Sequence, residues 1–337
     1  MGTATRVIST IVKIILILAI IAGIVLSIFF SSSKEPIAND RWIRPNSKPS
    51  FANTIESSKL DGKSDLDKAI YLYELANRNY ISCDKSAYFV QATNDMKMTI
   101  GITIPIQAYL YIYSLRTLDE YYKTEYSVPN GSVGSLFAKE DTDYAIRAYQ
   151  DLTMDYCYAQ KAYTPAVDET GEYNSLNVDW GDKNIVPAKK WKVEQEKEIF
   201  SKKQNETYYQ TKLTINKNTI KDVKVELKEE KDGNYYEIVI TLNPDVEETY
   251  ARNIENLRKG AGDDAYYKSM VETIQIWDNG YYKSFRSLDS WVGKGGNLTS
   301  DMDYFYTFYY EDEAGTVDSY KYFTDAKTVA KTYTASK

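Results

Sequence analysis

An alternation of apolar and polar residues with a period of two recurs between residues 213 and 288, and it limits the fold more than any other feature. The first run of alternating apolar positions is Val223, Val225 and Leu227, and the second is Ile238, Ile240 and Leu242. A Lys-Asp-Gly turn separates them. A later pair of such runs flanks Asn279-Gly280, which is typical of two-residue hairpin turns. Because successive side chains of a strand point to opposite faces, each pair predicts a β-hairpin with one buried face.

The same period appears earlier and later in the chain. Its apolar positions are Met96, Met98, Ile100, Ile102 and Ile104, and further strands are predicted at 108–112, 121–128, 144–163, 304–310 and 317–323. No strand-helix-strand alternation and no fixed-period repeat accompanies them. We therefore predict an α+β fold built on a strongly curved antiparallel β-sheet, a half-barrel, that packs against a few helices.

Two helices have a single apolar face that such a sheet can cover. The first begins after Ser64, whose hydroxyl can cap the first turn, and its apolar stripe is Leu66, Ala69, Ile70, Tyr73, Ala76 and Tyr80. The second begins at Asp245, carries Val246, Tyr250, Ile254 and Leu257 on one face, and ends at Gly260 and Gly262. A third, mostly solvated helix is expected at 188–204. We expect the first two to lie on the concave side of the sheet.

The N-terminal segment is long and apolar enough for a membrane. From Ile14 to Phe30 the chain carries no charge, and the apolar run extends back to Val7 with only Lys13 interrupting it. Since about 20 residues of helix span the hydrocarbon core, Val7–Phe30 predicts one transmembrane helix. The alternative is a cleaved signal peptide, because Arg6 and Lys13 precede the run and small residues follow it.

Residues 1–33 are thus predicted to be a transmembrane signal anchor, 34–62 a flexible tether rich in Ser, Pro and Asn, and 63–337 an exported α+β domain. Basic residues flank the anchor on both sides, but a long domain behind a short tail usually crosses the membrane. We expect a single-pass protein of the cell membrane with its C-terminal domain extracytoplasmic. The chain beyond the anchor holds all 48 acidic residues and all but two of the 41 basic ones, which argues against nucleic acid as a partner.

Histidine is absent, so every site that needs an imidazole as base, nucleophile partner or metal ligand is excluded. We assign no catalytic residue, no cofactor and no metal site, although 48 carboxylates leave an Asp/Glu hydrolase of envelope glycan open. Asp263-Asp264 and Asp301-x-Asp303 lack the spacing of a calcium loop. Cys83 and Cys157 can pair as one disulfide in an oxidising compartment or remain two buried thiols.

If the sheet and the helices enclose a cavity, its apolar lining is predicted to be Met96, Met98, Ile100, Ile102, Val223, Val225, Leu227, Ile238, Ile240, Leu242, Val246, Tyr250 and Ile254. Two methionines would suit a flexible ligand. The alternative is that these residues form a closed core, because any buried sheet face shows such alternation. A second surface is offered by tyrosines at 109, 111, 113, 304, 306, 309 and 310, as a docking face or as cross-strand pairs.

The order of elements resembles the LolA and LppX type of lipoprotein-carrier folds. The segment YYEIVITLNPDVEETYARNIENL followed by VETIQIWDNGYYKSF is also similar to exported, uncharacterised proteins of Gram-positive-type bacteria. The resemblance implies an apolar ligand, a lipid or an acyl chain, held between sheet and helices. We therefore expect a non-enzymatic, membrane-anchored protein that binds an apolar ligand or an envelope component; the alternative is a structural or protein-interaction module of the cell surface.

Overall fold

The computed structural model describes residues 46–117, 213–251, 253–311 and 313, and between them the strands at 121–130, 141–150, 153–162, 166–167, 173–174 and 185–187. For those strands, and for Tyr109, Tyr111, Tyr113, Arg116, Thr117 and Asn256, only the backbone is described. The predictions for the anchor, for the helix at 188–204 and for the strand at 317–323 fall outside these residues.

Eleven of the described strands form one sheet in the order β8-β5-β4-β3-β2-β1-β13-β12-β11-β10-β9, and every neighbouring pair is antiparallel. The strands are β1 (Lys85–Thr99), β2 (Thr103–Thr117), β3 (Tyr121–Asn130), β4 (Asp141–Gln150), β5 (Thr153–Ala162), β8 (Ile185–Pro187), β9 (Ile220–Lys228), β10 (Tyr235–Leu242), β11 (Tyr266–Trp277), β12 (Tyr282–Gly293) and β13 (Leu298–Tyr310). Two short strands, β6 (Ala166–Val167) and β7 (Tyr173–Asn174), pair separately.

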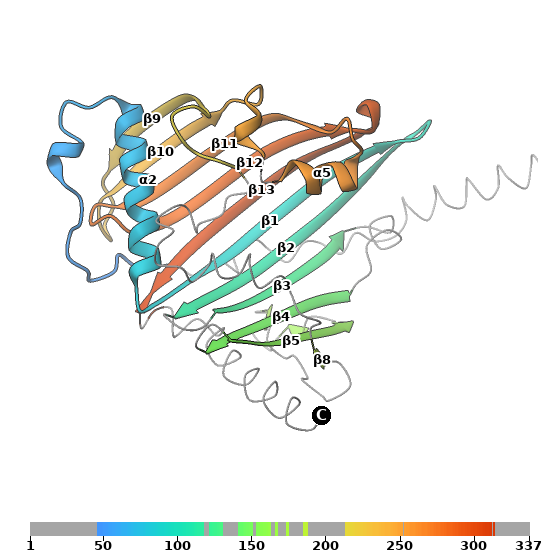
Figure 1. Cartoon of the computed structure of the whole chain (residues 1–337), viewed down its shortest axis with the longest axis horizontal. Coiled ribbons are helices and arrows are strands. Elements are labelled where there is room, and N and C mark those ends of the chain that lie inside the picture. Colours follow the sequence, from blue (N-terminus) through green and yellow to red (C-terminus); the bar gives the residue numbers. More distant parts are fainter. Residues whose placement is uncertain are drawn as a thin grey trace, which may run out of the picture.

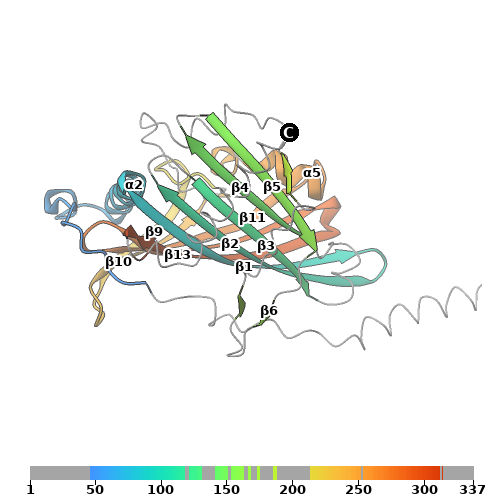
Figure 2. The same ribbon diagram turned by 90° about the horizontal axis from the view of Figure 1, so that it is seen from below.

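An antiparallel, open sheet with few helices confirms the predicted α+β class. The described helical elements are α2 (Asp65–Ser82), α5 (Ile254–Ala261) and three 3-10 turns, η2 (Ser57–Lys59), η3 (Glu247–Thr249) and η4 (Lys294–Gly296). Figures 1 and 2 show α2 and α5 on the side toward which the sheet curls. Both helices therefore cover the concave face, as the apolar stripes predict.

Helix α2 forms where its sequence predicts it. The backbone N–H of Asp67 donates to the Ser64 hydroxyl at 3.2 Å, and Asp65 and Asp67 place negative charge in the first turn. The buried face of the helix includes Ala69, Leu72, Tyr73, Leu75, Ala76 and Tyr80. It packs on Ile238, Ile240 and Leu242 of β10 and on Phe285 and Phe308, all fully buried. This end of the concave face is a closed core.

Part of the predicted tether packs on the domain. Asn46 donates from Nδ2 to the carbonyl oxygens of Lys283 and Phe308, at 2.7 and 2.9 Å. Thr54 donates from its backbone N–H to the Asn279 carbonyl at 3.2 Å, and the Phe51 ring lies 4.7 Å from that of Tyr281. Within the predicted tether, 34–62, the stretch from residue 46 onward is thus held against the hairpin turn between β11 and β12.

Two sequence predictions need correction. The run from Met96 to Ile104 is not one strand, because Gly101 adopts a φ of +84° and the chain reverses at residues 100–102. The helix predicted from Asp245 begins only at Ile254. Before it, the Thr249 hydroxyl donates to the Asn243 carbonyl at 2.9 Å, and its own carbonyl accepts from the Thr214 N–H at 2.8 Å. These bonds hold the backbone in a 3-10 turn and outcompete the helix.

Candidate functional site

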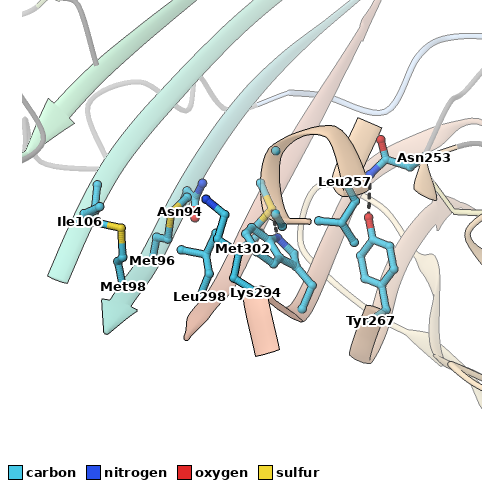
Figure 3. Close-up of a pocket in the computed structure, with 13 residues that line it drawn as sticks. Asn94, Met96, Met98, Ile106, Asn253, Leu257, Tyr267, Lys294, Leu298 and Met302 are labelled. Carbon is cyan, nitrogen blue, oxygen red and sulfur yellow. Dashed lines mark hydrogen bonds between the residues drawn. The ribbon is translucent and has the colours of Figure 1, made fainter. Parts of the chain in front are cut away.

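An open pocket of about 430 Å³ lies on the concave face beyond the closed core, between α5 and the ends of β1, β12 and β13 (Figure 3). Its lining is mainly apolar and consists of Asn94, Met96, Met98, Ile106, Asn253, Leu257, Gly260, Ala261, Tyr267, Trp291, Lys294, Leu298 and Met302. Three methionines and one tryptophan dominate this surface. Methionine side chains adapt to irregular apolar shapes, so the lining suits a flexible ligand.

The pocket depends on strands that are far apart in the sequence. Met98 of β1 lies opposite Leu298 of β13 and Ile104 of β2, and Met96 lies opposite Ser300 and Ile106. Because residues two apart on a strand share a face, Met96, Met98, Leu298 and Met302 all project toward α5. The pairing of β1 with β13 therefore assembles the floor of the pocket.

Helix α5 forms the roof and sits unusually close to the sheet. A Cβ on Gly293 would come within 2.3 Å of the Ala261 carbonyl oxygen and 2.8 Å of the Ala261 Cβ. Glycine at this position of β12 thus permits the contact between strand and helix. Asn253, just before the helix, donates from Nδ2 to the Tyr267 hydroxyl at 2.6 Å, which fixes the other end of the roof.

Polar atoms in the pocket are few and mostly engaged with the protein. The Trp291 Nε1–H donates to the Met302 sulfur at 3.4 Å, and the Ser300 hydroxyl donates to Asn94 Oδ1 at 2.5 Å. Lys294 lies at the rim, and its ammonium makes no ion pair with any residue that the structure describes. The site thus combines an apolar interior with a basic group at its edge.

A buried polar strip, formed by Glu272, Ser287 and Asp289, lies on β11 and β12 of the concave face. Glu272 is fully buried, its Oε1 accepts from the Ser287 hydroxyl at 2.9 Å, and its Oε2 has no hydrogen-bond partner among the described residues. Burial raises the pKa of Glu272 well above its usual value, and the neighbouring Asp289 raises it further. Burial and Asp289 also raise the pKa of Tyr267. The folded protein therefore favours the neutral form of Glu272 more than the unfolded chain does.

Glu272 and Asp289 lie on the same face of the sheet, but neither lines the pocket. A glycoside hydrolase needs two carboxyl groups that face a substrate in a cleft. Within the described residues, moreover, no group of three or more acidic or cysteine side chains is placed to hold a metal ion. The pocket itself therefore offers a binding surface and no carboxylate pair.

The predicted lining residues divide into four groups by location. Met96 and Met98 line the pocket, whereas Ile238, Ile240 and Leu242 lie in the closed core beneath α2 with half-buried Val223 and Val225 beside them. Ile254 is buried in α5, Tyr250 packs on Tyr267 with ring centroids 5.6 Å apart, and Val246 is half-buried before η3.

Ile100, Ile102 and Leu227 were predicted to line a cavity, and this is wrong. Ile100 and Ile102 occupy the turn between β1 and β2, where 66% and 54% of their surfaces are exposed. Leu227 is 52% exposed because it lies at the end of the edge strand β9, beyond Val225, whose N–H donates to Asp65 in the first turn of α2. The alternation showed which face of each strand carries the apolar residues. It did not show where along the strands that face becomes exposed to solvent.

Sequence reasoning missed most of the pocket. Trp291, Leu298 and Met302 belong to β12 and β13, and Leu257, Gly260 and Ala261 to α5. The three glycines at 293, 295 and 296 were a usable signal, because such a cluster marks a tight turn or a close approach of backbones. Apolar alternation on either side of it, at Trp291 and at Leu298, would have extended the predicted site.

The predicted tyrosine docking face is also not supported for its C-terminal members. Tyr304, Tyr309 and Tyr310 are buried, and half-buried Tyr306 packs against Tyr88 and Phe285. The side chains of the tyrosines at 109, 111 and 113 lie outside the described residues. The thiol of Cys83 is buried and donates to the Asn79 carbonyl at 3.2 Å. Since the Cys157 side chain is not described, its pairing with Cys83 stays a prediction.

In the portion of the chain that the structure describes, no helix has the length and apolar character to cross a membrane. The predicted transmembrane segment, Val7–Phe30, is not part of that portion.

No protein-family model and no curated protein matches the sequence. Among solved structures, the chain is similar to a domain described as an outer membrane lipoprotein-sorting protein from Vibrio parahaemolyticus, with 6% identity, a TM-score of 0.24, and 77% of this chain and 97% of that one covered. It is also similar to a DUF1329 family protein from Desulfovibrio piger, with 9% identity, a TM-score of 0.23, and 76% and 97% covered. At TM-scores this low, neither likeness assigns the chain to a family.

We predict that Glu272→Gln stabilises the protein increasingly as the pH rises. The folded-state pKa of Glu272 lies above the unfolded one, so between those two values the unfolded chain releases a proton that the folded chain keeps. Between these two pKa values, release of this proton on unfolding lowers the free energy of unfolding by up to about 1.4 kcal/mol for each pH unit. Thermal unfolding of the full chain at pH 5 and pH 8 should show the larger gain at pH 8. Glu74→Gln, at an exposed position of α2, is the control and should change stability by less than about 0.5 kcal/mol.

We predict that Gly293→Ala displaces α5 and disrupts the pocket. The added methyl group meets the backbone of Ala261, so unfolding should become easier by about 1–3 kcal/mol and the fluorescence of Trp291 should change. Gly260→Ala is a matched control in α5, because a Cβ there meets nothing within 4 Å. It should stabilise the helix by about 0.5–1 kcal/mol. Equal effects of the two substitutions would contradict the close approach.

Proposed function

We propose that this chain is a membrane-anchored, extracytoplasmic binding protein that holds an apolar ligand, an acyl chain of a lipid, in the pocket beneath α5 and catalyses no reaction. The observation that carries the proposal is the pocket itself. A volume of about 430 Å³ falls within the roughly 300–1,000 Å³ of small-molecule sites. A closed-core interaction module would not need such a space, so the pocket favours a ligand-binding protein over that alternative.

The distribution of polar groups supports a ligand with one apolar and one polar end. The interior is formed by Met96, Met98, Leu298 and Met302, while the polar atoms of the lining belong to Asn94, Asn253, Tyr267, Trp291 and Lys294. Binding sites of this kind use apolar contacts for affinity and a few polar groups for orientation. We propose that the acyl chain lies against the methionines and that the polar end of the ligand faces Lys294.

The proposed anchoring rests on the sequence of the N-terminal segment. Val7–Phe30 has the length and apolar character of one transmembrane helix. We predict that protease added to intact cells removes epitopes in the domain beyond residue 63, because that domain is extracytoplasmic. A domain protected in intact cells and digested only after lysis would show that its proposed location is wrong.

We predict saturable binding of a fluorescent long-chain fatty acid by the full chain, and a loss of affinity of at least about tenfold in Met96→Glu. The substitution places a carboxylate in the apolar lining, where desolvation of the charge or of the ligand opposes binding. Leu227→Glu is the matched control, because it adds the same charge at an exposed apolar position outside the pocket. Absence of saturable uptake by the unmodified chain would remove the proposed function.

A further inference from the structure

The turn between β1 and β2 exposes two large apolar side chains, whereas most other apolar positions of the sheet are covered. Ile100 donates from its N–H to the Ile102 carbonyl at 2.9 Å, and Gly101 between them has a φ of +84°. The two isoleucines are 66% and 54% exposed. Figure 1 shows this hairpin extending past the adjacent end of β12 and β13. We propose that the hairpin tip, residues Ile100–Ile102, inserts into the surface of a lipid bilayer that carries anionic headgroups.

The hairpin tip lies directly beside the pocket. Thr99 donates from its N–H to the Asn297 carbonyl at 2.8 Å, so the tip is tied to the loop that contains Lys294. Met98, the next residue but one before Ile100, lines the pocket and pairs with Leu298. Inserting the tip therefore places the pocket at the membrane surface, from which an apolar ligand can enter without crossing water.

The charged residue nearest to the hairpin tip along β1 is basic, and a second basic residue lies in the adjacent loop. Lys97 and Lys294 are exposed, and neither makes an ion pair within the described residues. The nearby acids keep their charge but are engaged with protein donors. Asp95 accepts from Gln107 at 2.5 Å, Asp301 accepts from the Ser290 hydroxyl at 2.5 Å, and Asp264 accepts from the backbone N–H groups of Lys294 and Gly295. Asp263 is exposed, and two basic residues, Arg258 and Lys259, precede it in the last turn of α5. Basic side chains next to an apolar tip favour anionic lipid.

The chain ahead of the domain is long enough for this arrangement. Asn46 is fixed at Phe308, about ten residues along β13 from Leu298, and the hairpin tip lies about three residues beyond Met98, the partner of Leu298. At about 3.3 Å per residue, the distance from Asn46 to the tip is about 43 Å. About 16 residues separate Phe30 from Asn46, and they reach about 53–58 Å when extended. If Val7–Phe30 spans the bilayer, the hairpin tip can therefore touch the same membrane.

A bilayer suits the hairpin tip better than a protein groove. Its two side chains project from a narrow two-stranded turn, and their surroundings are exposed Thr99, Gly101 and Thr103. A convex tip with two apolar residues offers little area for a protein interface, which buries about 800 Å² per partner. It needs no complementary shape to enter the interfacial region of a membrane.

The test introduces a tryptophan as a reporter of depth. The full chain carrying Ile102→Trp is reconstituted into vesicles of phosphatidylcholine and phosphatidylglycerol whose acyl chains carry bromine, which quenches nearby tryptophans. The matched control is Leu227→Trp, at a position of similar exposure at the opposite end of the sheet. Fluorescence of the unmodified chain is subtracted from both. We expect the tryptophan at position 102 to be quenched at least twofold more strongly than the one at position 227.

In the Ile102→Trp chain, Lys97→Glu together with Lys294→Glu should reduce the quenching in the anionic vesicles. Equal quenching at positions 102 and 227, or a tip that crosslinks to a protein in cells while bromolipid leaves it unquenched, would overturn the proposal. Flotation of the vesicles reports the anchor, and fatty-acid uptake reports the pocket. A chain whose anchor or ligand binding fails can therefore be distinguished from a chain whose hairpin tip does not enter the bilayer.

Discussion

The pairing of β1 with β13 is the interaction on which the rest of the structure depends. It joins strands separated by about 200 residues, and it aligns Met96 and Met98 with Ser300 and Leu298. The described sheet consists of two meanders, β1 to β5 with β8 at its edge and β9 to β13, that meet only at this ladder. Such long-range pairing must overcome the entropy of closing a large loop, so it needs apolar burial on at least one face. The concave face supplies that burial through α2, α5 and the residues beneath them.

The two helices give the concave face two different environments. Helix α2, with 18 residues, covers Ile238, Ile240 and Leu242 completely, whereas α5 has eight residues and leaves an open pocket beside Met98 and Met302. The strip of Glu272, Ser287 and Asp289 lies on β11 and β12 of the same face. A buried carboxyl group contributes less to stability than an apolar side chain in the same place.

Local patterns in the sequence predicted the local structure well. The hairpins around Gly233 and Asn279-Gly280, the helix capped by Ser64 and the α+β class all follow from alternation, turn residues and capping. The prediction was wrong where a single residue interrupts a pattern, as Gly101 does, or where side-chain bonds such as that of Thr249 replace a helical turn. Of the pocket, only Met96 and Met98 were named in advance. The remaining lining comes together through strand order and through the contact of Gly293 with Ala261, and no local pattern encodes either.

The proposed function requires that the space beneath α5 holds the acyl chain of a ligand. A photoreactive fatty acid crosslinked to the full chain, followed by mass spectrometry of its peptides, locates the bound chain directly. We expect saturable adducts on peptides that contain Met96–Met98, Leu257–Ala261 and Leu298–Met302, which lie far apart in the sequence and meet only in the pocket. Adducts confined to the strands beneath α2, such as Ile238–Leu242, or labelling that does not saturate, would contradict it.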